Sequence, residues 1–491
     1  MPGTRVGGTG ASPVDAGNIR LSRIQRSTPL ISRSDSGSRP RSVPVLSTSE
    51  QATTLFTAEA VAALGGPDWL AKQRAEAFER FGATPLPTVA EDLWQYSRIA
   101  DLDLGDFGPV PAADTNADGG EAELPATASE LLSLVPDRSG LVLTLNGALQ
   151  SAVLSAGAAD KGVTLGPISE HPGAAGLLGS VTAQFPGETD AYGALADAFM
   201  ADGVALTVPK NAELAEPIVI IHVLGGADAA VFPRTLIRLD DNAEATVIEL
   251  LVSGEGRLLV MPTTELAAAD GARLTHNLVQ QLGREAWQLG RLFAAAGRDA
   301  TLHSFQASLG ADMARSRTAS IITGQGGTAQ LLAAYFGDGD QMHDFRILQE
   351  HAAPRTTSDL VFKGAVAGTS RSVYTGLIRM RHGSKGANAF QTNRNLVLSD
   401  GAHADSVPNL DIQENDVRCS HASAIGPVDA EQRFYLESRG IGREVAERLI
   451  LLGFYAELLE RVTPAVRSIV IQSIVGRAEA ATSAAAAGGA T

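Results

Sequence analysis

The residues best suited to chemistry in this chain are a cysteine and a histidine two positions apart, Cys419 and His421. If they lie on a β-strand, both side chains point to the same face, so a thiol and an imidazole would be neighbours. Both groups are good ligands for iron, zinc or copper. Two ligands are too few for a metal site, so the pair would be one half of a shared site. The alternative is a small buried thiol beside an ordinary histidine, and the spacing alone leaves both interpretations open.

Other residues with chemical potential form no enzyme motif. The sequence has no GxxxxGK[ST] phosphate loop, no HExxH pair and no CxxC. The glycine-rich run at 324–327 precedes no helical pattern, so we interpret it as a turn. The basic run at 379–385 is expected to be a solvated turn, with an anion or partner contact as the alternative. Four further histidines are expected to be structural: His276, His303, His343 and His351.

Composition limits the possible partners. The formal net charge of the 491 residues is −16, which disfavours sequence-independent binding to nucleic acids and to anionic membranes. No apolar run approaches the roughly 18 residues that a membrane-spanning helix needs. Cys419 is the single cysteine, so no internal disulfide or cysteine-only metal site is possible within one chain. We therefore expect a cytoplasmic protein.

Both ends of the chain differ from its middle. Residues 1–50 are rich in Arg, Ser, Gly and Pro, and we expect a disordered appendage, with an organelle transit peptide as the alternative. Apolar residues recur at near-helical spacing over 57–81, so 51–135 is predicted to be an N-terminal helical region. The stretch 108–130, rich in Pro, Ala, Asp and Gly, is expected to be its flexible loop.

A long middle part, 136–426, is predicted to be a β-helix core. Its strands begin with 141–145, which a turn at Asn146 and Gly147 follows, and short strands dominate from 203 onward. A quasi-repeat of a tight turn and a strand aligns four alanines at intervals of 27, 28 and 29 residues: Ala245, Ala272, Ala300 and Ala329. Such a period is typical of a β-solenoid, in which stacked coils bury one another. A β-sandwich, which also has short strands with frequent turns, is not excluded.

The C-terminal part, 427–477, is predicted to be a helical domain. Asp429 and Gln432 are placed as in a capping box at a helix start. Val445, Leu449 and Leu452 give an amphipathic pattern, and Pro464 marks the first position of a further helix. The Ala- and Gly-rich tail, 478–491, is expected to be disordered.

Five sequence blocks, in this order, resemble the SufB/SufD family of iron–sulfur cluster assembly proteins. The blocks are RSVYTGLI at 371–378, QTNRNLVLS at 391–399, PNLDI at 408–412, the Cys419 to His421 stretch, and FYLESRGI at 434–441 followed by GF at 453–454. The continuous resemblance covers about 360–460. The block EDLWQY at 91–96 is similar to one typical of the SufD branch. SufB proteins usually carry several cysteines, so the single Cys419 also favours the SufD branch.

The resemblance implies a right-handed parallel β-helix, mostly β, flanked by N-terminal and C-terminal helical regions. It implies a non-catalytic scaffold subunit of the SufBCD complex, with SufB and the SufC ATPase as partners and SufC docked on the C-terminal helices. His421 matches a histidine that faces a SufB cysteine, and Cys419 matches a cysteine commonly found two residues earlier. The pair is therefore expected to share iron or a nascent cluster with SufB, and the chain is expected to acquire iron for cluster assembly.

Three alternatives stay open at this point. A SufB-like protein would carry the cluster directly, although the lack of cysteines disfavours that reading. A β-helical carbohydrate-active enzyme is less consistent with the sequence, because no clustered acids or secretion signal are evident. A homodimer in the absence of SufB is also possible.

Overall fold

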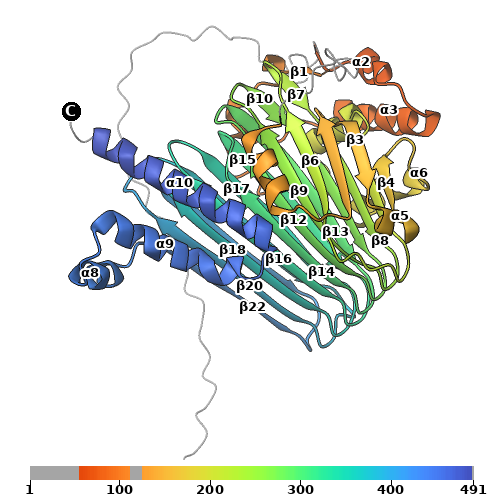
Figure 1. Ribbon diagram of the computed structural model, residues 1–491. Helices are drawn as coiled ribbons and strands as arrows, with labels where there is room; N and C mark the ends of the chain where they lie inside the picture. Colours follow the sequence, from red (N-terminus) through yellow and green to blue (C-terminus); the bar gives the residue numbers. More distant parts are fainter. Residues whose placement is uncertain (1–54, 111–123, 489–491) are drawn as a thin grey trace, which may run out of the picture. The chain divides into compact units, whose positions relative to one another are not determined.

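The computed structural model describes residues 55–110 and 124–488, with side chains up to residue 481. The predicted appendage at 1–50, most of the predicted loop at 108–130 and the last three residues lie outside the described part. Two long sheets dominate the fold (Figure 1).

The first sheet, sheet A, contains twelve strands of the described chain. They are β1 (Gly108–Pro109), β4 (Thr164–Pro167), β5 (Val204–Val208), β7 (Ala229–Val231), β8 (Arg234–Leu239), β10 (Leu258–Val260), β11 (Thr263–Ala268), β13 (Ala286–Ala296), β15 (Met313–Ile322), β17 (Met342–His351), β19 (Arg371–Met380) and β21 (His403–Ile412).

The second sheet, sheet B, contains ten strands of the described chain. They are β2 (Gly140–Leu145), β3 (Ala148–Leu154), β6 (Ile218–Leu224), β9 (Glu244–Ser253), β12 (Arg273–Gln281), β14 (Thr301–Ser308), β16 (Thr328–Gly337), β18 (Thr357–Val366), β20 (Asn388–Val397) and β22 (Arg418–Pro427).

The chain alternates between the two sheets, and each strand pairs with the next strand of its own sheet in parallel. For example, β15 pairs with β13 and β17, while β16, between them in sequence, pairs with β14 and β18. Only the first strands run differently, since β3 and β4 pair antiparallel with β2 and β5. This winding gives a parallel β-solenoid of about 8 turns, as the resemblance implied, and rules out the β-sandwich.

The turns that lead from sheet A into sheet B stack at one corner. In successive coils Asn242, Gly271 and Asp299 have positive φ angles of 57°, 70° and 54°, a conformation that Gly, Asn and Asp adopt most readily. Each backbone N–H donates to the next coil, as from Gly271 to the carbonyl of Arg298 at 2.7 Å. Gly326 continues this column with a φ of 75°, which confirms that the run 324–327 is a turn.

The predicted repeat is real, but its alignment is wrong at two of the three steps. The hydrogen-bonded register places Ala243, not Ala245, beside Ala272. Ala329 likewise lies beside Leu302, two residues after the predicted Ala300. The step from Ala272 to Ala300 is correct. An alanine at the turn and an alanine two residues further along the strand face the same side of the sheet. The repeat can therefore be aligned on either alanine, and residue type alone does not decide between them.

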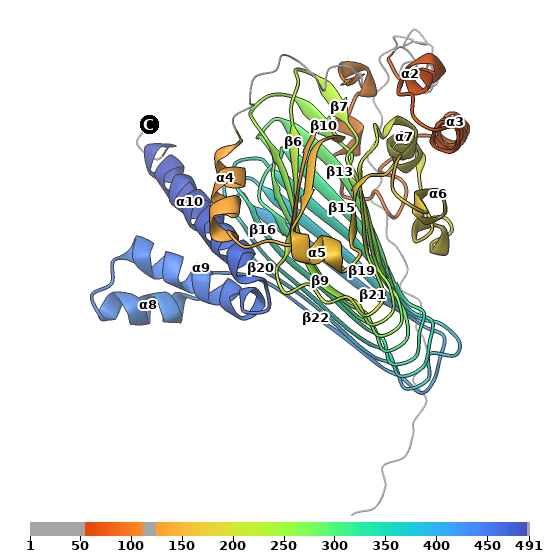
Figure 2. The same ribbon diagram turned by 45° about the vertical axis from the view of Figure 1, so that its right-hand side comes forward.

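Helices cover the outer faces of both sheets (Figure 2). Sheet B packs against α4, α9 and α10, and sheet A is covered by α3, α6 and α7. The helices of the described chain are α2 (Ala58–Ala63), α3 (Asp68–Ala83), η1 (Ile99–Asp101), η2 (Leu104–Asp106), α4 (Ala126–Leu134), α5 (Ala156–Asp160), α6 (Ala174–Leu177), η4 (Thr182–Gln184), α7 (Ala191–Phe199), α8 (Ala430–Ser438), α9 (Arg443–Leu459) and α10 (Pro464–Gly488).

Two helix boundaries differ from the prediction. Helix α4 begins at Ala126, inside the predicted loop, because Ala128 and Leu131 are buried against sheet B. Helix α10 continues to Gly488, through most of the tail predicted to be disordered. Ala478 and Ala481 pack against the apolar cluster on sheet B, and alanine has the highest helix propensity of all residues. The predicted starts at Asp429 and Pro464 are correct, and the Asp429 carboxylate accepts from the N–H groups of Glu431 and Gln432.

A fully buried carboxylate, that of Glu249 on β9, lies in the interior of the solenoid. His222 Nε2 lies 3.1 Å from one of its oxygens and His276 Nε2 lies 2.9 Å from the other. The hydroxyls of Thr235 and Thr264 also donate to it. Burial by itself raises the pKa of Glu249, but the hydrogen bonds and charges of the two histidines outweigh burial and hold the pKa well below its usual range.

We expect Glu249→Gln to lower the free energy of unfolding at pH 7 by about 3 kcal/mol, because it breaks a buried ionic cluster. Glu249 stabilises the fold above its unfolded-state pKa near 4.5, and this contribution is lost as the pH falls below that value. We would measure denaturant unfolding of the unmodified chain and of Glu249→Gln between pH 7 and pH 3.5. The difference between their free energies of unfolding should become smaller as the pH falls.

The control is Glu244→Gln on the same strand. The Glu244 side chain is 39% exposed and pairs with Arg273 at the surface, so its loss should cost less than about 1 kcal/mol. If Glu249→Gln loses no more free energy of unfolding than Glu244→Gln does, or if its loss stays constant with pH, the role given to the buried Glu249 carboxylate is wrong.

Candidate functional site

The solenoid ends at β21 and β22, the outermost strands of sheets A and B (Figure 2). Within the described chain each pairs on one side only, β21 with β19 and β22 with β20. Their other edges leave backbone N–H and C=O groups free to pair with another chain. We call the unpaired edges of β21 and β22 together the open edge.

Cys419 and His421 both lie on a strand, β22, within the predicted β-helix core 136–426. In the register of sheet B they stand beside Ala389 and Gln391 of β20. Cys419 is half-buried and packs with Leu410 against the apolar interior of the last coils. His421 is exposed and, two residues along the strand, faces the same side. The structure therefore places the predicted pair at the end of the solenoid interior, on the open edge.

The electrostatics of the pair favour a neutral thiol. Burial raises the pKa of Cys419 to about 11, whereas the thiolate is the form that binds metals. In the part of the chain that the structure describes, no group of three His, Cys, Asp or Glu side chains is placed to hold a metal ion. Cys419 and His421 do not make a complete site by themselves, and further ligands from a second chain stay a prediction.

The block at 91–96 lies on the outer face of sheet A, where Arg315 of β15 and Arg371 of β19 contact it. Arg315 donates to the carbonyl of Leu93 at 2.6 Å, and its guanidinium lies 3.8 Å from the Trp94 ring centroid. Arg371 of β19 lies 5.7 Å from the Tyr96 ring and pairs with Asp405 on β21 at 2.6 Å. The block is thus connected to the open edge through one arginine, a contact that the sequence did not reveal.

The basic run at 379–385 is a solvated turn only in its second part, because Arg379 and Met380 end strand β19. Acids neutralise its basic side chains. Arg379 pairs with Glu350 at 2.6 Å and with Asp411 at 2.8 Å. Arg381 also pairs with Glu350, and Lys385 lies 3.6 Å from Asp416.

Most of the scattered histidines are structural, as predicted. His276 binds Glu249, His343 lies 2.9 Å from the Ser308 hydroxyl, and His351 contacts the hydroxyls of Thr356 and Ser358. Sequence reasoning missed the cluster around Glu249. Its signal was the spacing, because His222 and His276 are each 27 residues from Glu249, close to one coil.

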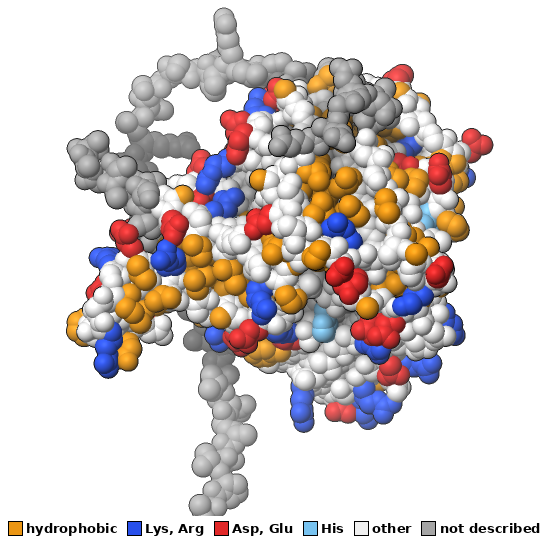
Figure 3. All heavy atoms as spheres, in the orientation of Figure 1, with side chains coloured by type: hydrophobic (Ala, Val, Ile, Leu, Met, Phe, Trp, Pro, Cys, Tyr) orange, Lys and Arg blue, Asp and Glu red, His pale blue; other side chains and the backbone are white. Residues whose placement is uncertain are grey.

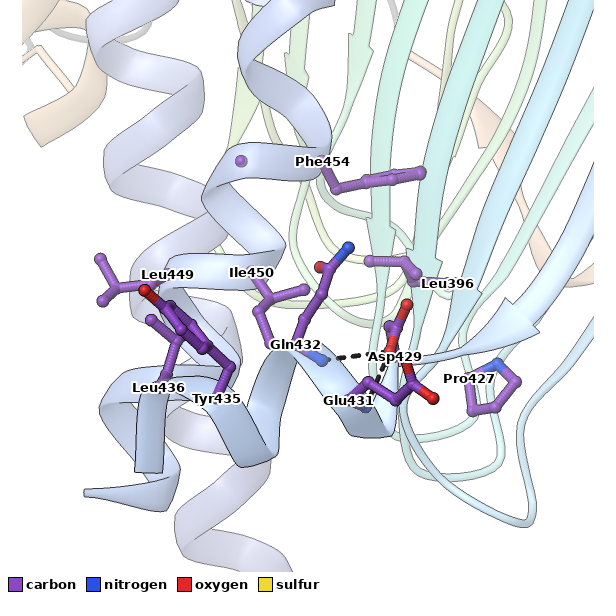
Figure 4. A pocket seen from close by; sticks show the side chains of 11 residues that line it. Leu396, Pro427, Asp429, Glu431, Gln432, Tyr435, Leu436, Leu449, Ile450 and Phe454 are labelled. Atoms are coloured by element: carbon purple, nitrogen blue, oxygen red, sulfur yellow. Dashed lines mark hydrogen bonds between the residues drawn. The ribbon is translucent and has the colours of Figure 1, made fainter. Parts of the chain in front are cut away.

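An apolar groove of about 800 Å³ opens between α8, α9 and the last strands of sheet B. Tyr435 and Leu436 on α8 lie beside Leu449 on α9 at one end of it, and Phe454 on α9 points toward Leu396 on β20 at the other end (Figure 4). Tyr435 is 57% exposed. Apolar side chains gather over these two helices at the surface (Figure 3). Exposed apolar patches of this kind are typical of surfaces that bind other proteins.

Among the helices within 55–110 and 124–488, none combines the length and apolar character needed to cross a membrane.

Comparison with known proteins gives a consistent result. Residues 222–454 match the SufBD core domain of the SUF system for FeS cluster assembly, and residues 46–220 match the SufBD protein N-terminal region. The match therefore extends beyond the blocks at 360–460.

Curated relatives agree with these matches. A SufBD family protein of Mycobacterium tuberculosis is 34% identical over 295 residues, which cover 58% of this chain and 74% of that protein. SufD of Bacillus subtilis is 30% identical over 55% of this chain and 62% of its own length. SufD of Escherichia coli is 29% identical over 52% of this chain and 62% of its own length.

The high pKa of Cys419 gives a direct prediction for alkylation. At pH 8 a thiol with a pKa of about 11 is ionised to roughly one part in a thousand, so it should react about 100-fold more slowly with iodoacetamide than free cysteine does. Cys419 is the single cysteine, so mass spectrometry reads its labelling without ambiguity. The rate should rise about tenfold per pH unit between pH 7 and pH 9.5. A rate that levels off near pH 8.5 would contradict a buried, neutral thiol.

Proposed function

Because this chain belongs to the SufB/SufD family of iron–sulfur cluster assembly proteins, we propose that it is a SufD-type scaffold subunit of a cytoplasmic SufBCD complex. In this proposal it performs no catalysis of its own, and the SufC ATPase supplies the energy. The observation that supports the proposal is the open edge, on which Cys419 and His421 both lie. The single cysteine favours the SufD type over a SufB-like direct cluster carrier.

SufB would dock on the open edge by adding strands to both sheets. Addition of a strand to an exposed edge satisfies the backbone groups that the last coil leaves unpaired. Exposed apolar side chains on the last strands, Val407, Ile412 and Ile425, would be buried at the same time. A second copy of this chain could use the same edges, which is the basis for a homodimer when SufB is absent.

Iron or a nascent cluster would be the cargo of this interface. His421 would contribute an imidazole nitrogen and Cys419 a thiolate, and SufB would supply the remaining ligands. A metal ion favours loss of the thiol proton, so the high pKa of Cys419 would keep the site inactive until cargo and partner are both present. This arrangement supports a role in iron acquisition and cluster assembly.

SufC would dock in the groove between α8 and α9. Helix α9 is fixed to the solenoid two and three coils before the open edge, since Lys363 on β18 pairs with Glu457 at 2.9 Å and Tyr455 donates to the carbonyl of Tyr335 on β16 at 2.6 Å. A movement that ATP drives in SufC would therefore act on the last coils through a rigid helix. Such transmission between packed elements is a common switching mechanism.

Co-expression with SufB and SufC tests the proposal. A tag on this chain should recover both partners in stoichiometric amounts, with ATPase activity. His421→Ala should leave the complex intact and lower its iron or cluster content at least tenfold, because an imidazole ligand is lost.

The matched control is His403→Ala on β21, whose side chain is 65% exposed on the neighbouring edge strand. The complex that contains His403→Ala should hold as much iron or cluster as the complex of the unmodified chain. Failure to recover either partner would refute the assignment to the complex, and normal loading of His421→Ala would refute the site.

The groove gives a separate prediction. Tyr435→Ala should weaken SufC binding about tenfold or more in a titration, because exposed aromatic side chains dominate the energy of protein interfaces. Tyr96→Ala removes another exposed tyrosine, 42% accessible and outside the groove, and should leave SufC binding unchanged. Equal effects of the two substitutions would exclude the groove as the docking site.

A further inference from the structure

A sealed layer of polar side chains lies inside the solenoid behind the open edge, on the adjacent strands β19 and β20 and on β16. Its members are at most 3% exposed, and they are Tyr335, Ser372, Tyr374, Gln391, Asn393 and Asn395. All except Tyr335 belong to the sequence blocks at 371–378 and 391–399, for which neither cluster chemistry nor apolar packing gives a reason. A buried polar layer must satisfy all its hydrogen bonds or it destabilises the fold.

The layer divides into two hydrogen-bonded groups. In the first, the Tyr335 hydroxyl donates to Asn395 Oδ1 at 2.6 Å and accepts from Asn393 Nδ2 at 3.2 Å. Ser372 donates to Asn395 Oδ1 at 3.2 Å, and Asn395 Nδ2 donates to Asn393 Oδ1 at 2.9 Å. This group connects the strands of the coils before the last one.

The second group reaches the open edge itself. The Tyr374 hydroxyl donates to Gln391 Oε1 at 3.0 Å, and Gln391 Nε2 donates to the backbone carbonyl of Asn409 on β21 at 3.2 Å. Gln391 also stands beside His421 of β22 in the register of sheet B. One buried amide is therefore bonded to one edge strand and lies directly beneath the candidate ligand on the other.

A glycine makes this arrangement possible. A Cβ atom at Gly376 would lie 2.3 Å from Gln391 Oε1 and 2.4 Å from the Tyr374 hydroxyl. Any larger residue would force both side chains away from their present positions. The sequence Tyr-Thr-Gly at 374–376 therefore serves the bond between Tyr374 and Gln391.

We propose that Gln391, held by Tyr374, is a positioning residue of the open edge. Its amide fixes the backbone of β21 at Asn409 relative to β22 at His421, so that the two edge strands present one preformed surface to the partner. In the part of the chain that the structure describes, neither edge strand is paired with a further coil, and this interior bond restrains β21 from within. The inference rests on the proposed docking of SufB for its effect on affinity, but its effect on β21 is independent of any partner.

Two tyrosine variants provide a matched test. Tyr374→Phe and Tyr335→Phe each remove one buried hydroxyl, but only Tyr374 is bonded to Gln391. Gln391→Leu removes the bond to Asn409 directly. Thermal unfolding, hydrogen exchange of the β21 amides and affinity for SufB are measured on the full chain of each variant.

We expect both tyrosine variants to unfold at similarly reduced temperatures. Tyr374→Phe and Gln391→Leu should exchange the amides of β21 about tenfold faster than the unmodified chain and bind SufB about tenfold more weakly. Tyr335→Phe should change neither quantity. If Gln391→Leu does not fold, the comparison of the two tyrosine variants still decides the question.

Unchanged β21 exchange in Tyr374→Phe, or an equal increase in Tyr335→Phe, would overturn the inference. If the unmodified chain does not bind SufB, the proposed function fails. The exchange of β21 then still decides whether Gln391 positions the edge.

Discussion

The structure depends on one constraint: every coil of a β-solenoid buries its neighbours, and the last coil has no neighbour on one side. At the other end of the sheets, the antiparallel strands β3 and β4 form the border. At β21 and β22 the parallel pairing simply stops within the described chain. An exposed edge is a site for pairing with another chain, and most proteins cover or charge such edges. Here the edge carries Cys419 and His421, so we interpret it as an interface.

The interior of the solenoid varies along its length. The first coils enclose apolar residues around the Glu249 cluster, and the last coils enclose the polar layer around Gln391. Buried polar groups seldom add stability over well-packed apolar side chains, but they can fix one geometry among several. The layer lies beneath the open edge, where such geometric control would matter if the proposed partner docks there.

Local patterns placed Cys419 and His421 in a β region, whereas the choice of a β-helix over a β-sandwich came from the resemblance to the SufB/SufD family. The repeat of turn and strand indicated the solenoid, and Asp429 and Pro464 marked their helix starts correctly. The helix α4 and the full length of α10 were missed, because burial against sheet B decides them and composition does not. The cluster of Glu249 and the bond from Gln391 to Asn409 were also missed. These contacts join residues 14 to 27 positions apart, and only the exact register of the coils brings them together.

The most direct test of the account is hydrogen exchange of this chain with and without SufB. Addition of SufB should slow exchange at His403–Ile412 and Arg418–Pro427, while Ala148–Leu154, the strand β3 at the opposite end, should exchange at the same rate. Protection that appears at β3 or on the outer faces of the sheets, with none at β21 and β22, would contradict the claim that the unfinished coil is the interface.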